Sequence, residues 1–317
     1  MHGSLPREGA KPTLGRPGGG FAVTFKLTHN RAVFLMVAVA LMWSTAGVVT
    51  RHLDAARSFE VTFWRAFFTG LSLVVLLPLV RGRRVFANMR HAGPAFWLSG
   101  VCWSVMFTAY MVALTLTSVG NVLITMSLGP LMTALIARVF IGHRIPARTW
   151  TAIAVAGAGI AYMYGAQLQG GQMLGTLVAL CVPIAGATNW TVTQHSHAKG
   201  HDVDLVPAVF VGAVISAAIT LPMAWPLQAT GHDLGLLAYL GVFQLAIPCV
   251  LSVLCARVLK APELSLLALL EVVFGILLAW VGAGEAPGQT VAVGGTLVIG
   301  ALVANELLGW RQRSTPS

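Results

Sequence analysis

Ten long apolar segments, separated by short polar stretches, constrain this chain more than any other feature of its sequence. A helix needs about 20 apolar residues to cross the hydrocarbon core of a bilayer. Of the 317 residues, 56% are hydrophobic and only 9% are charged, whereas an average soluble domain is about 25% charged. A soluble fold of this length would need far more polar surface, so the composition predicts an all-α integral membrane protein.

The apolar segments predict ten transmembrane helices. They are Ala32–Thr50, Phe59–Val80, Ala95–Leu114, Ser118–Ile141, Thr149–Tyr164, Leu174–Thr193, Val206–Met223, Leu234–Leu254, Leu264–Gly282 and Thr290–Leu308. Residues 1–31 are basic, rich in Gly and Pro, and lack an apolar core, which predicts a disordered cytosolic tail. Residues 309–317 form a second short cytosolic tail.

Lysine and arginine are distributed unevenly among the predicted loops. If the N-terminus is cytosolic, 17 of the 20 Lys and Arg residues lie on the cytosolic side, and only Arg51 and Arg57 lie on the other. The remaining one, Arg65, lies within the second apolar segment. By the positive-inside rule, both termini are predicted to be cytosolic. Although the net charge is +10, this distribution favours a lipid bilayer as the partner and argues against nucleic acid.

The chain also contains a weak internal repeat. Residues 40–47 resemble residues 179–186, and residues 113–143 run parallel to residues 255–285. Each copy has five predicted spans, an odd number, so the second copy must enter the membrane in the opposite orientation. The copies, residues 32–165 and 172–308, therefore predict two inverted five-helix repeats, a plan of many secondary transporters with a substrate site near the bilayer midplane.

Four short motifs occur in order along the chain. They are Met42-Trp43-Ser44, then Phe63-Trp64-Arg65-Ala66-Phe67-Phe68, then the small-residue turn from Ala113 to Asn121 with Pro130, and finally Leu270-Glu271-Val272 running to Gly284-Glu285. Together with the ten spans, this set resembles the EamA-domain family of the drug/metabolite transporter superfamily. The resemblance implies an exporter of amino acids or related small metabolites in the bacterial inner membrane. The sequence departs from the family pattern at His143, where a glutamate is common, and at Val272, where a proline is usual.

Two ionisable residues lie deep in apolar segments, where a charge is costly and usually faces a polar interior. Arg65 is a candidate anchor for a substrate carboxylate, with a snorkelling side chain or an ion pair to Glu60 as the alternative. Glu271 shares a small-residue helix face with Ala268 and Gly275. A carboxyl group held there is a candidate for proton coupling, and a hydrogen-bonded structural glutamate is the alternative.

Polar and aromatic side chains recur on several predicted spans. The further substrate-binding candidates are Asn121, Asn189, Gln244, Trp43, Trp103, Phe107, Tyr110 and Trp190. Gln244, Pro248 and Ser252 follow i, i+4 and i+8, which predicts one shared helix face. Hydrogen bonds between helices are the alternative for the polar groups, and ordinary packing or an interfacial belt is the alternative for the rings.

The sequence has no recognisable catalytic constellation. It contains no phosphate-binding loop, nucleophile elbow or HExxH motif, so no enzyme activity and no cofactor are predicted. The four cysteines lie in apolar runs and indicate no disulfide framework. A metal site at His195, His197 and His201 is conceivable, but these residues lie in a short loop without matching ligands, and no metal is predicted.

The combined interpretation is a secondary transporter that works by alternating access, with one repeat rocking against the other. Two alternatives stay open, a membrane enzyme acting on lipid-linked substrates and a membrane subunit or sensor that transports nothing. The glycine-rich faces at Gly157–Gly159 and Gly294–Gly295 pack either within the bundle or between the subunits of a homodimer.

Overall fold

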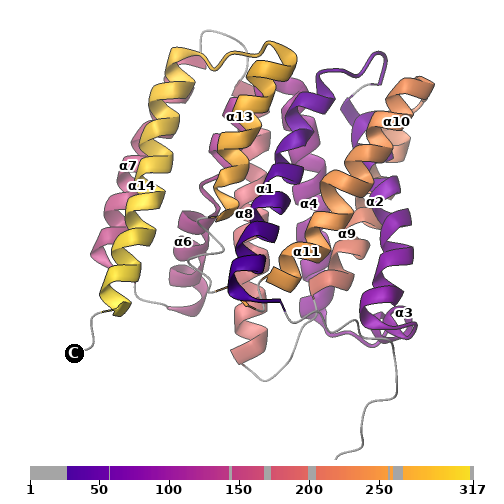
Figure 1. The fold of residues 1–317 in the computed structure, drawn as a ribbon, viewed down its shortest axis with the longest axis horizontal. Coiled ribbons are helices and arrows are strands. Elements are labelled where there is room, and N and C mark those ends of the chain that lie inside the picture. Colours follow the sequence, from indigo (N-terminus) through magenta and orange to yellow (C-terminus); the bar gives the residue numbers. More distant parts are fainter. Residues whose placement is uncertain are drawn as a thin grey trace, which may run out of the picture.

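A computed structural model shows the chain as a bundle of helices (Figure 1). It describes residues 27–56, 58–142, 145–167, 173–198, 205–255, 258–259 and 267–314, and every regular element in these ranges is a helix. The predicted N-terminal tail lies outside the described residues up to residue 26, and so does His143.

The helices follow one another in the order below, with one π-helical segment, η1. They are α1 (His29–Thr50), α2 (Ser58–Arg81), α3 (Val85–Met89), α4 (Pro94–Leu116), α5 (Val119–Met126), α6 (Gly129–Ile141), α7 (Ala147–Gln167), α8 (Met173–Ala198), α9 (Leu205–Ala224), α10 (Gly231–Tyr239), η1 (Leu240–Ala246), α11 (Ile247–Cys255), α13 (Leu270–Ala283) and α14 (Gln289–Ser314). Within the described residues, each of the ten predicted segments overlaps one or more of these helices, the start of Leu264–Gly282 lies outside them, and the short α3 was not predicted.

Among the described residues, seven helical stretches are long and apolar enough to cross a membrane. Two more apolar helices, Met173–Asn189 and Leu270–Ala283, are shorter than a typical span. The prediction of an all-α, multi-pass membrane protein is therefore confirmed, while the number of ten spans stays a prediction.

The predicted span from Ser118 to Ile141 is an interrupted helix. It is divided into α5, which ends at Met126, and α6, which begins at Gly129. Pro130 lies in the first turn of α6. A proline has no N–H to donate to the carbonyl four residues earlier, and its ring crowds that carbonyl. The break between α5 and α6 places Pro130 in a first helical turn, where a missing N–H is tolerated.

A second proline acts on the span that contains Gln244. Pro248 cannot donate to the Gln244 carbonyl, and the seven residues of η1 end directly before Ile247. The N–H of Ile247 bonds to the carbonyl of Val242, five residues earlier. Such π-helical insertions are rare and are often found at functional sites.

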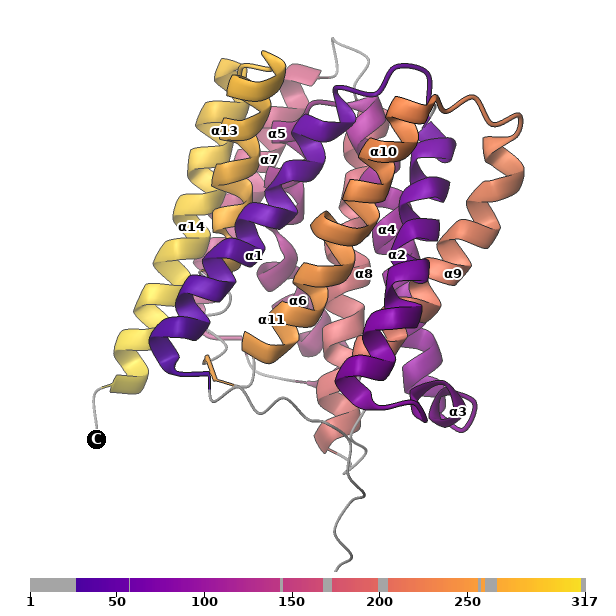
Figure 2. The same cartoon turned by 45° about the vertical axis from the view of Figure 1, so that its right-hand side comes forward.

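Helices from the two halves of the chain are interleaved. From the first half, α2 and α4 pack against α9 of the second half, α7 packs against α14, and α1 packs against α13. Figures 1 and 2 both show α7, α13 and α14 together at one side and α2, α9 and α10 at the other. Neither side of the bundle therefore consists of one half alone.

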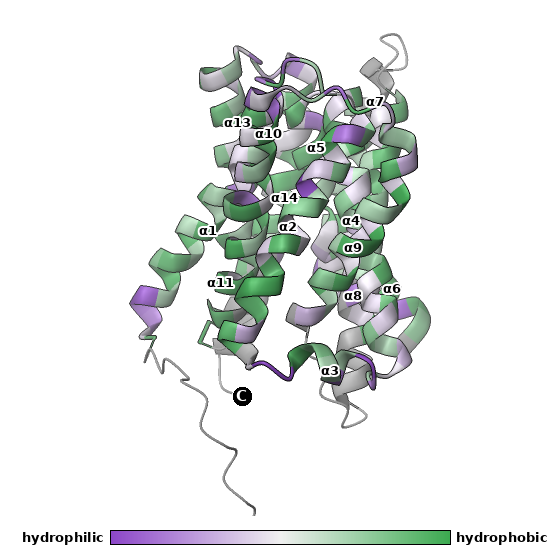
Figure 3. Ribbon diagram, turned by 90° about the vertical axis from the view of Figure 1, so that its right-hand side faces the viewer, coloured by the Kyte–Doolittle hydropathy of each residue, from purple (hydrophilic) through white to green (hydrophobic). Residues whose placement is uncertain are grey.

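The surface of the bundle is strongly apolar. Large side chains such as Phe34, Phe140 and Val281 are 76%, 79% and 84% exposed. Figure 3 shows hydrophobic residues along the helices and hydrophilic residues concentrated at the bundle ends and connecting loops. An apolar surface of this extent fits a lipid environment, because soluble proteins rarely expose large contiguous apolar patches.

A pair of glycines brings α7 and α14 into close contact. A Cβ atom on Gly159 would lie 2.8 Å from the Gly294 carbonyl oxygen, and one on Gly294 would lie 2.7 Å from the Gly159 carbonyl oxygen. These two glycines therefore pack within the chain, whereas a Cβ on Gly157 would meet nothing within 4 Å. The glycine-rich faces were predicted to pack either within the bundle or between subunits. Gly159 and Gly294 pack within the bundle.

We expect Gly159→Ala to lower the free energy of unfolding by about 1–3 kcal/mol, since the new methyl group forces α7 and α14 apart. Gly157→Ala, on the same helix, is the matched control and should leave stability unchanged or slightly higher because alanine favours helix. Thermal unfolding in detergent measures both. Equal melting temperatures for the two variants would show that the close approach of α7 and α14 is unimportant.

Candidate functional site

Arg65 on α2 is buried in the bundle, with only 3% of its surface exposed. Its Nε and Nη2 donate to Gln244 Oε1 at 3.2 and 2.9 Å. Its guanidinium carbon lies 5.5 Å from the ring centroid of Tyr110 and 5.8 Å from that of Phe107, both on α4. These distances are typical of cation–π contacts. The snorkelling alternative is therefore wrong, because the charged group points into the bundle.

The alternative ion pair between Arg65 and Glu60 is also wrong. Glu60 lies one helical turn and a half away, at the start of α2, and is 1% exposed. Its Oε1 accepts hydrogen bonds from the backbone N–H groups of Gln228 and Ala229 at 2.8 and 2.7 Å. This carboxylate therefore holds the loop between α9 and α10.

Gln244 orients the Arg65 side chain. While its Oε1 accepts from Arg65, its Nε2 donates to the Trp43 carbonyl oxygen on α1 at 3.0 Å. The amide is thereby fixed at both ends and joins η1 to α1 and α2. The close approach of η1 to α2 requires Gly241, because a Cβ atom there would lie 2.5 Å from Phe68 Cβ and 2.9 Å from the Arg65 carbonyl oxygen.

The direct polar partner of the Arg65 side chain is neutral. Within the part of the chain that the structure describes, no carboxylate oxygen lies within 4.0 Å of its guanidinium. Glu271, in the first turn of α13, interacts with Arg65 electrostatically from further away and is only partly buried. A buried cation without a close counter-ion is unfavourable, so this site is suited to binding an anionic group.

Two aromatic residues near Arg65 carry buried polar atoms that lack hydrogen-bond partners among the described residues. They are the Tyr110 hydroxyl and Trp103 Nε1. Leaving such a group unpaired costs about 1–3 kcal/mol, and native structures contain few of them. The Tyr110 hydroxyl belongs to the ring that contacts Arg65, so it is placed to bond to a ligand at the same site.

The structure brings some of the predicted site residues together and separates others. Phe107, Tyr110, Gln244 and, at longer range, Glu271 surround the Arg65 guanidinium, and the Trp43 backbone carbonyl bonds to Gln244. Trp103 lies against Phe107, with ring centroids 5.5 Å apart, and also packs on α9 at Gly212. The side chain of Trp190 lies outside the described residues.

The two asparagines occupy other helices. Asn121, on α5, donates from Nδ2 to Thr117 Oγ1 at 3.0 Å, a local bond to the residue four positions earlier, while its Oδ1 has no partner within the described ranges. Asn189 is 1% exposed on α8.

Cys249 was not among the predicted site residues. Gln244 bonds to Arg65 directly, and Cys249, five residues later, lies within electrostatic range of it. The π-helical segment lies within the predicted face of Gln244, Pro248 and Ser252 and shifts the helical register by one residue, so that shared face stays a prediction. A proline four residues after a polar residue in an apolar segment was the available signal for such a shift.

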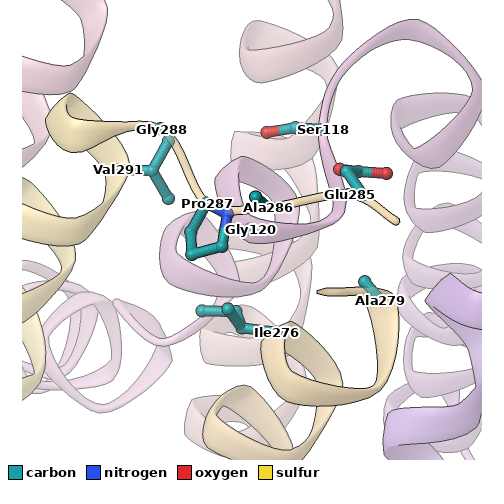
Figure 4. Close-up of a pocket in the computed structure, with 9 residues that line it drawn as sticks. All are labelled: Ser118, Gly120, Ile276, Ala279, Glu285, Ala286, Pro287, Gly288 and Val291. Atoms are coloured by element: carbon teal, nitrogen blue, oxygen red, sulfur yellow. The ribbon is translucent and has the colours of Figure 1, made fainter. Parts of the chain in front are cut away.

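A separate pocket lies at the end of the bundle that carries the α1–α2 loop. Its empty volume is about 260 Å3, and its lining includes Ser118 and Gly120 from the α4–α5 region and Ile276, Glu285 and Pro287 from the α13–α14 region. In Figure 4 the Ser118 and Glu285 side chains lie on one side of this pocket, and Pro287 and Ile276 on the other. The residues that contact Arg65 are not part of its lining.

Possible metal ligands at the same end serve a structural role. Atoms of Asp54, His232 and Asp233 lie within 4.8 Å of one another. Asp233 Oδ1 accepts from the N–H of Asp54 at 2.7 Å, and Oδ2 accepts from the N–H groups of Ala55 and Ala56 at 3.1 Å. This carboxylate is occupied by backbone donors, so it anchors the α1–α2 loop. The side chains of the predicted cluster His195, His197 and His201 lie outside the described residues.

The fold and the buried polar centre are those of a polytopic membrane transporter. The model of the EamA-like transporter family matches residues 30–165 and again residues 173–305. The chain belongs to the EamA-like transporter family, as the sequence motifs predicted.

Three comparisons extend this result. The chain is 22% identical to the pseudopaline exporter CntI of Pseudomonas aeruginosa over 86% of this chain and 94% of that protein. It is 27% identical to an uncharacterized transporter of Vibrio cholerae serotype O1, over 41% of this chain and 44% of that protein. A solved crystal structure with 20% identity superposes with a TM-score of 0.62 over 90% of this chain and 99% of its own, which shows a shared fold.

We expect Gln244→Leu to destabilise the protein by about 1.5–3 kcal/mol, because it leaves the buried Arg65 guanidinium without its hydrogen-bond acceptor. Tyr110→Phe is the matched comparison in the same site and should not lower stability, since its hydroxyl has no partner to lose. Thermal unfolding of both variants in detergent checks this difference. Equal stability of Gln244→Leu and the unmodified protein would contradict the assigned hydrogen bonds.

Proposed function

We propose that this protein is a secondary transporter that exports small carboxylate-bearing metabolites, with amino acids and their derivatives as the first candidates. The observation that supports this most directly is the buried Arg65 guanidinium, whose direct polar partner is a neutral amide. A substrate carboxylate would neutralise this charge and form charge-assisted hydrogen bonds, which are roughly twice as strong as neutral ones.

The surroundings of Arg65 suit the rest of such a substrate. The rings of Phe107 and Tyr110 offer an apolar surface for a side chain, and the Tyr110 hydroxyl offers a further hydrogen bond. Glu271 provides an opposite charge at longer range, which suits the ammonium group of an amino acid. Export is also the activity stated in the name of the Pseudomonas aeruginosa relative.

The proposed setting is the bacterial inner membrane, with ten spans in two inverted repeats and both termini in the cytosol. The Lys and Arg distribution supports this orientation. Alternating access would then expose the Arg65 site to each side in turn. Because helices of the two halves are interleaved, each moving body would combine helices from both repeats. A homodimer is compatible with the open helix surface at Gly157.

Counterflow of labelled amino acids into proteoliposomes tests the proposal. We expect saturable uptake by the unmodified protein, and an affinity about 10–100-fold lower in Arg65→Ala, the loss expected for hydrogen bonds to a charged group. Arg65→Lys keeps the charge but loses the planar fork of donors, so its affinity should be intermediate. Arg138→Ala removes an arginine on the surface of α6 and is the matched control.

The alternatives give different results in the same assay. No uptake of any amino acid by the folded protein would remove the amino-acid proposal and favour other metabolites, an enzyme or a sensor. Unchanged affinity in folded Arg65→Ala would show that Arg65 does not bind the substrate.

Glu271 is proposed to couple transport to protons. Replacing it by the neutral isostere in Glu271→Gln should abolish the dependence of export on a pH gradient, while counterflow without a gradient continues. The measurement compares the two modes in the same proteoliposomes. Gradient-driven export that persists in Glu271→Gln would exclude this residue as the proton carrier.

A further inference from the structure

Arg51 and Glu285 form a polar network at the end of the bundle that carries the α1–α2 loop. Arg51 Nε donates to Glu285 Oε2 at 2.7 Å. The two Nη atoms of Arg51 donate to the carbonyl oxygens of Leu114 and Thr117 at 2.6 and 2.9 Å, and Glu285 Oε1 accepts from the Val119 N–H at 2.6 Å. We call these five residues the Arg51–Glu285 network.

The network joins three loops that are distant in sequence. Arg51 follows α1, Leu114 and Thr117 lie at the end of α4, Val119 begins α5, and Glu285 lies between α13 and α14. Both of these bonds to the Glu285 carboxylate therefore connect the second segment matched by the family model to the first. At this end of the bundle the α13–α14 loop cannot move away from α1 and the α4–α5 turn while these bonds exist.

Two other carboxylates also connect the segments at this end, but in a different environment. Asp233 binds the backbone at Asp54 and Ala55, and Glu60 binds the backbone at Gln228. Asp233 and Glu60 are 0% and 1% exposed, and they link the α1–α2 region to the α9–α10 region, where α2 and α9 pack against each other. Because both carboxylates are shielded from water, we regard their bonds as fixed anchors between the α1–α2 and α9–α10 regions.

The Arg51–Glu285 network is, in contrast, accessible to water. The side chains of Arg51 and Glu285 are 29% and 24% exposed, and Glu285 also lines the open pocket of Figure 4. Water can replace the bonds of a partly exposed ion pair at low cost. Of the three carboxylate contacts, this is the one most accessible to water.

We propose that the Arg51–Glu285 network is a gate that holds the α1–α2 end of the transporter closed and that opens by separation of the α13–α14 loop from α1 and the α4–α5 turn. This inference rests on the proposed alternating-access function. The internal repeat aligns Glu285 with His143 in the sequence, so the first copy has no carboxylate at the equivalent position.

A distance measurement between spin labels tests the gate without any substrate. Labels at His52→Cys and Gln289→Cys, both exposed positions on either side of the network, report its opening by double electron–electron resonance. The exposed native thiol is removed by Cys181→Ser, since the other three cysteines are buried. We expect a single short distance in this background, and a broader distribution with longer distances after Arg51→Ala or Glu285→Gln.

A second label pair, Ala55→Cys and Gln228→Cys, spans the Asp233 and Glu60 anchors and is the matched control. Its distance should not change in either gate variant. The proposal is wrong if the distance between positions 52 and 289 is the same with and without the network in folded protein. It is also wrong if both pairs lengthen together, because the network would then stabilise the whole end. Neither outcome depends on whether amino acids are the substrate.

Discussion

The hydrogen bond between the Arg65 guanidinium and the Gln244 amide is the interaction on which the centre of this protein depends. A guanidinium in an apolar bundle is tolerated only where protein groups replace water. Here that replacement comes from one amide oxygen and two aromatic faces. The amide oxygen accepts hydrogen bonds from the guanidinium and the aromatic faces attract its positive charge, but none of these groups carries a negative charge that would neutralise it. The same arrangement that makes the arginine tolerable in the fold therefore leaves it able to bind an anion.

Irregular helix geometry makes this arrangement possible. Pro248 removes one backbone hydrogen bond, the chain before it winds as a π-helix, and Gly241 lets that segment approach the backbone of α2. In this geometry the Gln244 amide bonds to Arg65, and Cys249 lies within electrostatic range of the same guanidinium. The local irregularity costs helical hydrogen bonding and in return places a neutral acceptor beside a buried charge.

The polar groups of the protein fall into two sets with different physical roles. In the interior, the Gln244 amide accepts two hydrogen bonds from Arg65 and donates one to the Trp43 carbonyl, which fixes the orientation of the guanidinium. At the α1–α2 end, carboxylates accept from backbone N–H groups of loops on the other half of the chain. Two of these carboxylates are fully buried and one is partly exposed, so their capacity to exchange with water differs. Burial, more than charge, separates a permanent anchor from a contact that can open.

Much of the fold was determined by the sequence alone, because hydrophobic length and charge asymmetry act locally along the chain. Where the structure describes them, the ten apolar segments are mainly helical, and the motifs around Arg65 and Glu271 correctly indicated the EamA-like family. Only the tertiary structure decided which candidates meet. It placed Gln244 and Tyr110 at Arg65, directed Glu60 to a loop instead, and added Cys249. Those choices depend on helix register and close packing between distant segments, and a one-residue shift in one π-helical turn is enough to change them.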